Sequence, residues 1–203
     1  MILGNHALLG ALRAGWFAID ATDPPFSQLD PSKPPFNTSA LDLHLGTEIA
    51  VPSSGTPTSI DFSSGGSIAK LLSANSETKT ISTDQPFRLA QNKFVLANTR
   101  ERVDFRPQKP IQFPDFPTVT SLAARVEGKS SLARCGLLVH FTAPTIHAGF
   151  NGTITLEMIN LGPWPIVLTP NMPICQLIVE MVLGPVASAP NQFAGQARPV
   201  GNT

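Results

Sequence analysis

Residues 125–160 bring together groups that could bind an anion and transfer a proton. The motif GKSS at residues 128–131 is followed three residues later by Arg134, which we expect to be buried. This pattern predicts a turn into a single helical turn with a serine as its N-cap. Backbone N–H groups, hydroxyls and a lysine at such a start could form a small anion site. An ordinary helix start would give the same motif, so both interpretations stay open.

One carboxylate, Glu157, lies inside the apolar run TITLEMIN. Period-2 alternation predicts a strand with Ile154, Leu156 and Met158 on one face and Thr153, Thr155, Glu157 and Ile159 on the other. A positioned carboxylate can serve as general acid and base. The simpler alternative is a solvent-facing strand glutamate. Charged residues are scarce around it, which favours a functional role.

The histidines and cysteines indicate neither a metal site nor a familiar nucleophile. His140 and His147 have no third ligand at a recognisable spacing, and Cys135 and Cys175 form no zinc motif. We expect Cys135 to be a small buried hydrophobe and the histidines to be hydrogen-bonded strand or loop residues. No Gly-x-Ser-x-Gly elbow is present for serine hydrolysis. Two free cysteines favour a reducing, cytoplasmic location.

The composition narrows the class of protein. The 203 residues suit one domain, and Lys+Arg and Asp+Glu balance at 14 each, so a basic-patch nucleic-acid binder is not expected. No apolar run reaches the roughly 20 residues that span a bilayer, and the N-terminus does not resemble a signal peptide. Twenty prolines with 14% charged residues favour an all-β domain over a helical bundle.

The first part of the chain predicts a short helix, an arm and a strand. Asn5 is the expected N-cap of a helix over residues 5–15, with Leu8, Leu9 and Leu12 as its apolar stripe and Gly15 as its stop. The proline-rich residues 23–36 predict an ordered arm or loop. From Ser39, alternation places Leu41, Leu43 and Leu45 on one face of a strand and Asp42 and His44 on the other.

The rest of the chain predicts further short strands. Residues 52–84 could be a flexible surface excursion with a helical turn at 67–74, and we assign no function to them. Residues 86–105 predict a hairpin around the turn at 91–93, and 165–169 and 174–182 predict two more strands. The tail from Gly184 shows no periodicity and is expected to be extended or mobile. Short strands with turns between them indicate a β-sandwich, jelly roll or small barrel.

Residues 127–162 resemble the core of the dCTP deaminase family, part of the wider group of dUTPase-like trimeric β folds. Residues 37–46 are similar to the early strand of that family, 87–103 to the segment before its motif, and 192–196 to its closing arm. The resemblance implies one domain over residues 1–203, with a dUTPase-like β-clip or distorted jelly-roll barrel. It also implies a short N-terminal helix and a C-terminal arm at 184–203 that closes over the site.

The resemblance also assigns roles to residues. Glu157 would be the acid/base, Ser130 and the carbonyl of Ala143 would hold the attacking water, and Arg134 would keep Glu157 ionised and oriented. The substrate contacts would come from Lys129, Ser131, Ala143, His147, Phe193 and Gln196. The triphosphate would carry Mg²⁺, so no metal ligand is expected from the protein. Family members are homotrimers with active sites between subunits.

The chain departs from the family pattern at several positions. His147 stands where the family places an aspartate, which in dUTPases activates the water and in deaminases helps to hold the deoxyribose. Pro144-Thr145 replaces a more polar pair, and the arm has Gln192 and Phe193 where a lysine and a tyrosine would help to bind phosphate. His147 therefore argues against dUTP hydrolysis by the dUTPase route.

The leading hypothesis is zinc-independent hydrolytic deamination of dCTP to dUTP and ammonia, a reaction of pyrimidine deoxynucleotide metabolism at a cyclic amidine C–N bond. The enzymatic alternative is a dUTP diphosphatase or a bifunctional deaminase/diphosphatase. Two non-enzymatic hypotheses also stay open: a non-catalytic nucleotide-binding trimer and a purely structural, capsid-like β domain. Neither a nucleic-acid nor a membrane partner is expected.

Overall fold

The computed structural model describes residues 1–20, 24–53, 59–60, 68–107, 110–113, 115, 117–187 and 195–200. Helices are few and short: α1 (Asn5–Ala14), the 3-10 helix η1 (Phe26–Gln28), α2 (Ile68–Ala74) and α3 (Ser130–Ala133). The strands are β1 (Ala18–Asp20), β2 (Leu41–Pro52), β3 (Ser76–Thr80), β4 (Phe87–Leu89), β5 (Phe94–Asp104), β6 (Val119–Gly128), β7 (Leu137–Val139), β8 (Thr145–Ile146), β9 (Asn151–Asn160), β10 (Ile166–Leu168) and β11 (Pro173–Leu183).

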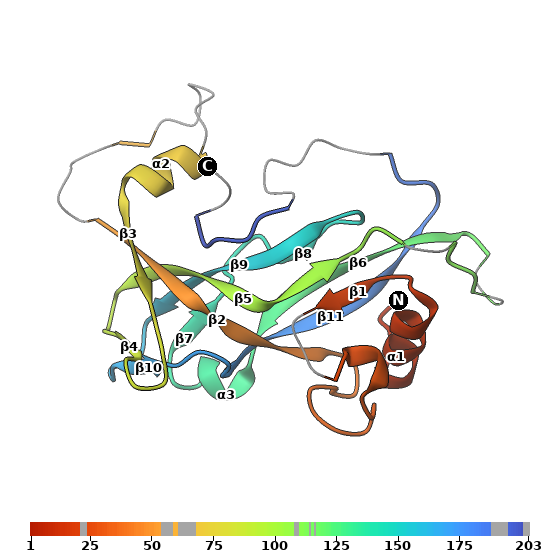
Figure 1. The fold of residues 1–203 in the computed structure, drawn as a ribbon, viewed down its shortest axis with the longest axis horizontal. Coiled ribbons are helices and arrows are strands. Elements are labelled where there is room, and N and C mark those ends of the chain that lie inside the picture. The colour runs from red at the N-terminus through yellow and green to blue at the C-terminus, as the bar shows by residue number, and fades with distance from the viewer. Residues whose placement is uncertain are drawn as a thin grey trace.

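The described strands form a large antiparallel sheet with the order β7-β9-β5-β2-β11-β6-β8, to which β1 adds on β5 and β3 on β2. A separate pair joins β4 to β10. Figure 1 shows the long strands crossing the molecule, with α1 at one end and α2 at the other. The expectation of a mainly β protein with a short N-terminal helix is confirmed.

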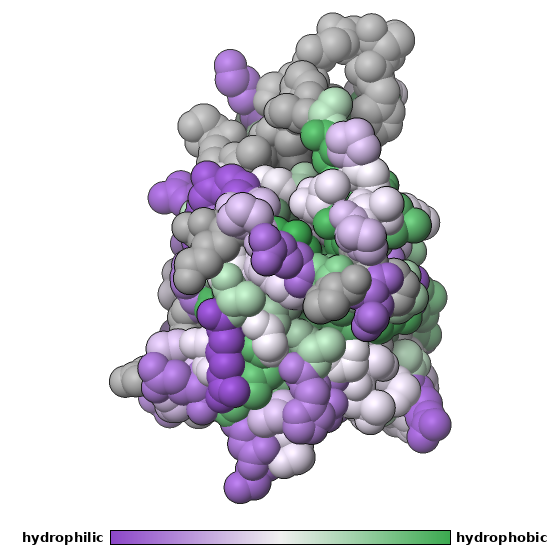
Figure 2. Space-filling view, turned by 90° about the vertical axis from the view of Figure 1, so that its right-hand side faces the viewer, coloured by the Kyte–Doolittle hydropathy of each residue, from purple (hydrophilic) through white to green (hydrophobic). Residues whose placement is uncertain are grey.

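The alternating strands bury the faces that the sequence predicts. Leu41, Leu43 and Leu45 are completely buried, whereas Asp42 and His44 point to the other side of β2 and are partly exposed. On β9, Ile154, Leu156 and Met158 lie in the same core. On the face shown in Figure 2, hydrophilic side chains are spread around apolar ones.

Helix α1 and the proline-rich segment pack together. The helix ends as predicted, with Gly15 at a left-handed φ of 71°, but Gly4 and not Asn5 is its N-cap. Asn5 is instead the first helical residue, and its amide donates to the carbonyl of Pro31 at 3.0 Å. Phe26 and Phe36 are buried, so the expected ordered arm is present.

The predicted hairpin over residues 86–105 is wrong in its pairing. Both strands and the turn exist, but β4 pairs with β10 and β5 pairs with β9 and β2. The buried Asn160 at the end of β9 explains the difference. Its amide donates to the carbonyls of Leu89 at 3.0 Å and Trp164 at 2.8 Å, and its backbone carbonyl accepts from Asn92. These bonds hold β4 against β10.

Five of the described strands were not predicted: β1, β3, β6, β7 and β8. Strands β3 and β6 are the longest of them. Strand β3 lies within the expected excursion and pairs with β2, but its side chains are polar and mostly exposed. Strand β6 pairs with β11 along nearly its whole length, and its buried face includes the small residue Ala124. Residues 195–200 of the tail, expected to be extended or mobile, are packed against the rest of the chain, with Gln196 and Val200 buried.

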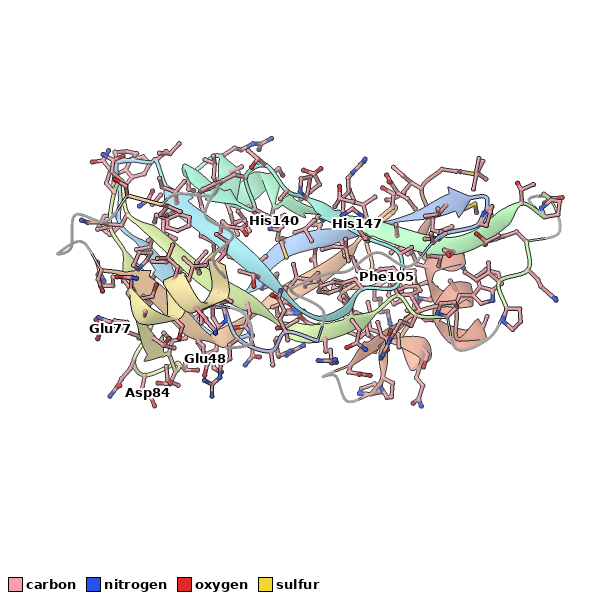
Figure 3. The ribbon with its side chains drawn as sticks, turned by 90° about the horizontal axis from the view of Figure 1, so that it is seen from above. Glu48, Glu77, Asp84, Phe105, His140 and His147 are labelled. Carbon is pink, nitrogen blue, oxygen red and sulfur yellow. The ribbon has the colours of Figure 1, made fainter. Side chains whose placement is uncertain are left out.

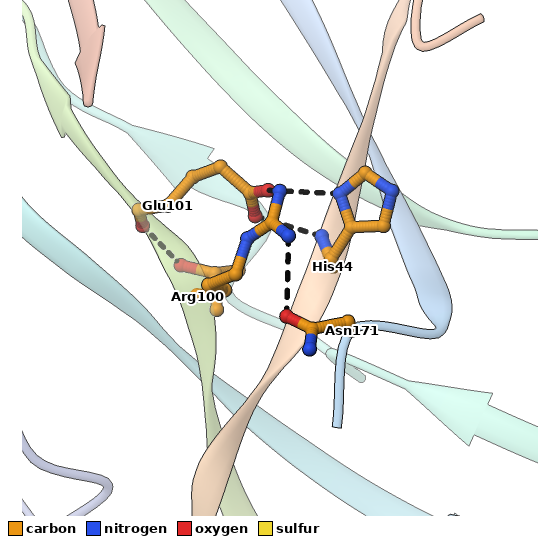
Figure 4. Close-up of polar contacts among 5 residues, drawn as sticks. His44, Arg100, Glu101 and Asn171 are labelled. Carbon is orange, nitrogen blue, oxygen red and sulfur yellow. Dashed lines mark hydrogen bonds and ion pairs between the residues drawn. The ribbon is translucent and has the colours of Figure 1, made fainter. Parts of the chain in front are cut away.

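A buried carboxylate fixes the point where β2 changes partner, because β2 pairs with β11 at its start and with β5 and β3 later. Glu101 of β5 is fully buried and accepts bonds from the backbone N–H and Nδ1 of His44 and from Arg100, each at 2.8 Å (Figure 4). Arg100 also donates to Asn171 at 3.1 Å. Burial alone would raise the pKa of Glu101, but the His44 donors outweigh it, and the pKa lies below the ordinary value of 4.5.

Two residues before Glu101, the hydroxyl of Thr99 bridges an interruption in the hydrogen-bond ladder between β5 and β9. The register of this pair shifts between Asn98 and Arg102. There Thr99 donates to the carbonyl of Glu101 at 2.7 Å and accepts from the N–H of Ile154 at 3.0 Å. Buried backbone groups left unpaired are costly, so these bonds set where β9 lies against β5.

We expect Glu101→Gln to lower the free energy of unfolding by roughly 3 kcal/mol near neutral pH, because it removes the charge from a buried, paired carboxylate. Since the folded pKa is depressed, the stabilisation is present above pH 4.5 and is lost as the pH falls through the folded value. Urea unfolding at several pH values measures both effects. The control is Glu180→Gln, which breaks a partly exposed pair with Arg125 and should cost less than about 1 kcal/mol. An equal loss in both variants would contradict the assignment.

Candidate active site

Glu157 lies on the outward face of β9, at a concave groove of about 1250 Å³. Its side chain is 34% exposed, so it is neither free in solvent nor enclosed. The groove is lined by residues of β5, β6, β8, β9 and α2, by the loops around them, and by the C-terminal residues 196, 199 and 200. Most lining side chains are apolar, which is typical of a ligand site with a few polar groups.

His140 connects two groups to which the family resemblance assigns roles. Its Nδ1 is 2.9 Å from Oε2 of Glu157, an ion-pair distance without the alignment of a regular hydrogen bond, and its Nε2 is 2.7 Å from the carbonyl of Ala143. Burial alone would lower the pKa of His140. The carboxylate of Glu157 and the carbonyls of Ala143 and Thr155 outweigh it, so the pKa lies above 6.5.

The backbone explains why His140 reaches this position. It follows β7 with a left-handed φ of 63°, and its N–H donates to the carbonyl of Glu157 at 2.8 Å. The expectation of a hydrogen-bonded histidine is confirmed, but its link to Glu157 was missed. Only the pairing of β7 with β9 brings the two residues together. Figure 3 shows His140 and His147 in the middle of the molecule, with Phe105 nearby, whereas Glu48, Glu77 and Asp84 lie at one end.

The predicted site residues in and next to α3, Ser130, Ser131 and Arg134, lie outside this groove. Ser130 and Ser131 open α3 with exposed side chains, and Lys129, not a serine, is the N-cap residue. Arg134 at the C-cap of α3 is exposed, so the expected burial is wrong. It closes a four-residue helix at the surface, where no described element covers it. Within one chain, neither serine nor Arg134 lines the groove that holds Glu157.

Lys129 is held by an ion pair with Asp42, which lies on the face of β2 opposite to its buried leucines. Its Nζ lies 2.6 Å from Oδ1 of Asp42, which also accepts from Asn37 at 2.9 Å and from Gln176 at 3.2 Å. Both members of the ion pair are largely buried, at 21% and 14% exposure. One end of the GKSS motif is therefore anchored, while its two serine side chains face outward.

The other predicted substrate-contact residues differ in where they lie. Ala143, His147 and Gln196 line the groove. Gln196 is nevertheless buried, and its amide donates to the carbonyl of Thr153 at 2.9 Å. Phe193 and Gln192 lie outside the described residues.

The two cysteines are unpaired and differ in environment. Cys135 is exposed in the turn after α3, so the expected burial is wrong for it. Cys175 is completely buried in β11, and burial raises the pKa of its thiol well above the usual range. Among the described residues, no three His, Cys, Asp or Glu side chains gather as a metal site. None of the described helices is long and apolar enough to cross a membrane.

Sequence comparisons connect this arrangement with known proteins. Residues 2–182 match the family described as dCTP deaminase-like. A "dCTP deaminase, dUMP-forming" of Methanothermobacter thermautotrophicus is 31% identical over 204 residues, covering 98% of this chain and 91% of the relative. The dCTP deaminase of Thermomicrobium roseum is 31% identical over 205 residues with the same coverage.

The fold has a counterpart among solved structures. The 2'-deoxycytidine 5'-triphosphate deaminase of Agrobacterium tumefaciens superimposes with a TM-score of 0.61 at 19% identity, over 89% of this chain and 48% of that one. That likeness supports the fold, and the extent of the family match and of the sequence identity decides the relationship. The chain belongs to the dCTP deaminase-like family.

Proposed function

We propose that this protein is a dCTP deaminase, a hydrolase that converts dCTP to dUTP and ammonia by acting on a cyclic amidine C–N bond. The observation that carries the proposal is Glu157, held in a large groove of a chain whose curated relatives are named as dCTP deaminases. The proposed reaction uses no zinc. Its proton transfers are assigned to the carboxylate.

Glu157 can perform the required proton transfers in sequence. A water must lose a proton as it attacks C4 of cytosine, and N3 and the departing amine must gain protons; one positioned carboxylate can move all of these. The carbonyl of Ala143 has two lone pairs, so it can accept from His140 and still hold the attacking water. His140 would then fix both the carbonyl and the carboxylate on either side of that water.

The remaining catalytic groups are proposed to come from a neighbouring subunit of a homotrimer. Ser130 and Arg134 are exposed and lie outside the Glu157 groove of their own chain. A second copy that placed its α3 over the groove would add a hydroxyl for the water and a guanidinium that favours ionised Glu157. Lys129 and Ser131 would contact the phosphates there.

Substrate contacts and surroundings complete the proposal. His147, Phe193 and Gln196 are assigned to substrate binding, with residues 184–203 as an arm of the single domain 1–203. Mg²⁺ is expected on the triphosphate oxygens, the ligands that this ion prefers. No protein ligand for Mg²⁺ is assigned. The proposed setting is deoxynucleotide metabolism in the cytoplasm, without a nucleic-acid or membrane partner.

We expect the purified protein, incubated with dCTP and Mg²⁺, to release ammonia and accumulate dUTP. Glu157→Gln should reduce turnover by at least about 10²-fold, because the amide cannot exchange the proton. Ammonia, dUTP and pyrophosphate are measured in one assay. Pyrophosphate release would favour the dUMP-forming reaction, and nucleotide binding without any product would favour a non-catalytic trimer.

Mixing two inactive variants tests whether the site is shared between chains. Glu157→Gln and Arg134→Ala each disable one half, but in co-expressed trimers about a quarter of interfaces would pair an intact Glu157 with an intact Arg134 from the neighbour. We expect deamination to return toward that fraction. Trimers that carry both substitutions in every chain are the control and should stay inactive. No recovery in verified mixed trimers would place the whole site in one chain.

The His140–Glu157 pair predicts a pH-dependent contribution to stability. Because the folded pKa of His140 is raised, its stabilisation is complete below 6.5 and is lost as the pH rises through the folded value. His140→Gln should cost about 1 kcal/mol at pH 6, a modest value because solvent screens the partly exposed Glu157, and less at pH 9.

Urea unfolding from pH 5.5 to 9 measures the difference, with His147→Gln as the control on the same groove. A pH-independent difference for His140→Gln would rule out an ion pair.

A further inference from the structure

A small hydrophobic cluster lies apart from the main core and joins segments that are distant in the sequence. It consists of the buried Ala50, Leu96 and Val200, with Leu72 and Phe94 packed against them. Leu72 belongs to α2, Leu96 to β5, and Val200 to the C-terminal arm.

The cluster adjoins the proposed acid/base. Leu96 is the register partner of Glu157 in the β5–β9 ladder, so the two side chains are neighbours on the same face. Ile68 and Leu72 of α2, together with Leu96 and Val200, line the Glu157 groove. The excursion to which the sequence assigns no function thus contributes a wall of this groove.

Hydrogen bonds hold the arm to β9 alongside the cluster. The N–H of Thr153 donates to the carbonyl of Gln196 at 3.0 Å, and the N–H of Gly195 donates to the carbonyl of Asn151 at 2.6 Å. The close approach requires a glycine at position 152, where a Cβ would lie 2.9 Å from the carbonyl oxygen of Gln196. Residues 195–200 therefore fold against their own chain, beside the strand that carries Glu157.

From this arrangement we infer that α2 is the docking site, here called the seat, of the C-terminal arm. Leu72 and Val200 are positioning residues that hold the arm against the wall of the Glu157 groove. The hydrogen bonds to β9 fix the first residues of the described arm segment, 195 and 196. The apolar cluster, to which α2 contributes Leu72, fixes its end at Val200. Without Leu72 the cluster around Val200 loses one of its packed apolar side chains, and the arm is seated in only a fraction of molecules. The kinetic consequence of the inference rests on the proposed function.

Hydrogen exchange tests the seat directly in the full-length protein. In Leu72→Ser and in Val200→Ser, the amides of Gly195 and Thr153 should exchange about ten-fold faster or more, because the arm opens more often. Leu71→Ser is the matched control, since Leu71 precedes Leu72 on α2 but belongs neither to the cluster nor to the groove lining. It should leave these amides within about two-fold of the wild type. Leu72→Met should restore slow exchange.

Steady-state kinetics with dCTP gives the second readout. A partly seated arm raises the KM by the factor by which the competent fraction falls, while kcat is kept once substrate is bound. Loss of folded enzyme would instead lower kcat at an unchanged KM.

The inference is overturned if exchange at Gly195 and Thr153 is unchanged in both serine variants, or if Leu71→Ser accelerates it equally. If wild-type protein does not turn over dCTP, the proposed function fails, and the exchange result still decides the seat.

Discussion

The carboxylate of Glu101 is the constraint on which the positions of the other elements depend. It is fully buried, and the donors that satisfy it come from two strands, β2 and β5. Removing a partner from such a cluster leaves a buried charge or donor unpaired, so the strands keep one arrangement where β2 exchanges β11 for β5. The adjacent Thr99 carries this order on to β9 through the N–H of Ile154. The place of Glu157, three residues further along β9, follows from these bonds.

In the described chain, the candidate site residues lie on two separate surfaces. One holds Glu157, His140 and the carbonyl of Ala143 in a groove, and the other presents the serines and arginine of α3. The β7–β9 pair joins the first set, whereas the second set sits on a four-residue helix that the Lys129–Asp42 ion pair anchors at its start.

Local patterns predicted the parts of the structure that depend on neighbouring residues. The alternation in TITLEMIN placed Glu157 on the outward face, and Gly15 ended α1, because both depend on backbone geometry over a few residues. Pairing between distant segments was not predictable in this way. The β4–β10 pair depends on Asn160, β6 needs its partner β11 to appear as a strand, and the contact of His140 with Glu157 depends on a left-handed residue. The family resemblance supplied roles for residues, but not the contact between α2 and the arm.

The strand order also has a consequence for synthesis of the protein. Strand β2 ends at Pro52, but its first half pairs with β11, which begins at Pro173, about 120 residues later. On the ribosome, this edge of β2 at residues 41–44 therefore stays unpaired until nearly the whole chain has emerged. Such distant pairing makes folding slow and leaves an unpaired strand edge in the nascent chain. Asp42 and His44 lie on the polar face of β2, away from its buried leucines. They would help to keep the unpaired strand soluble.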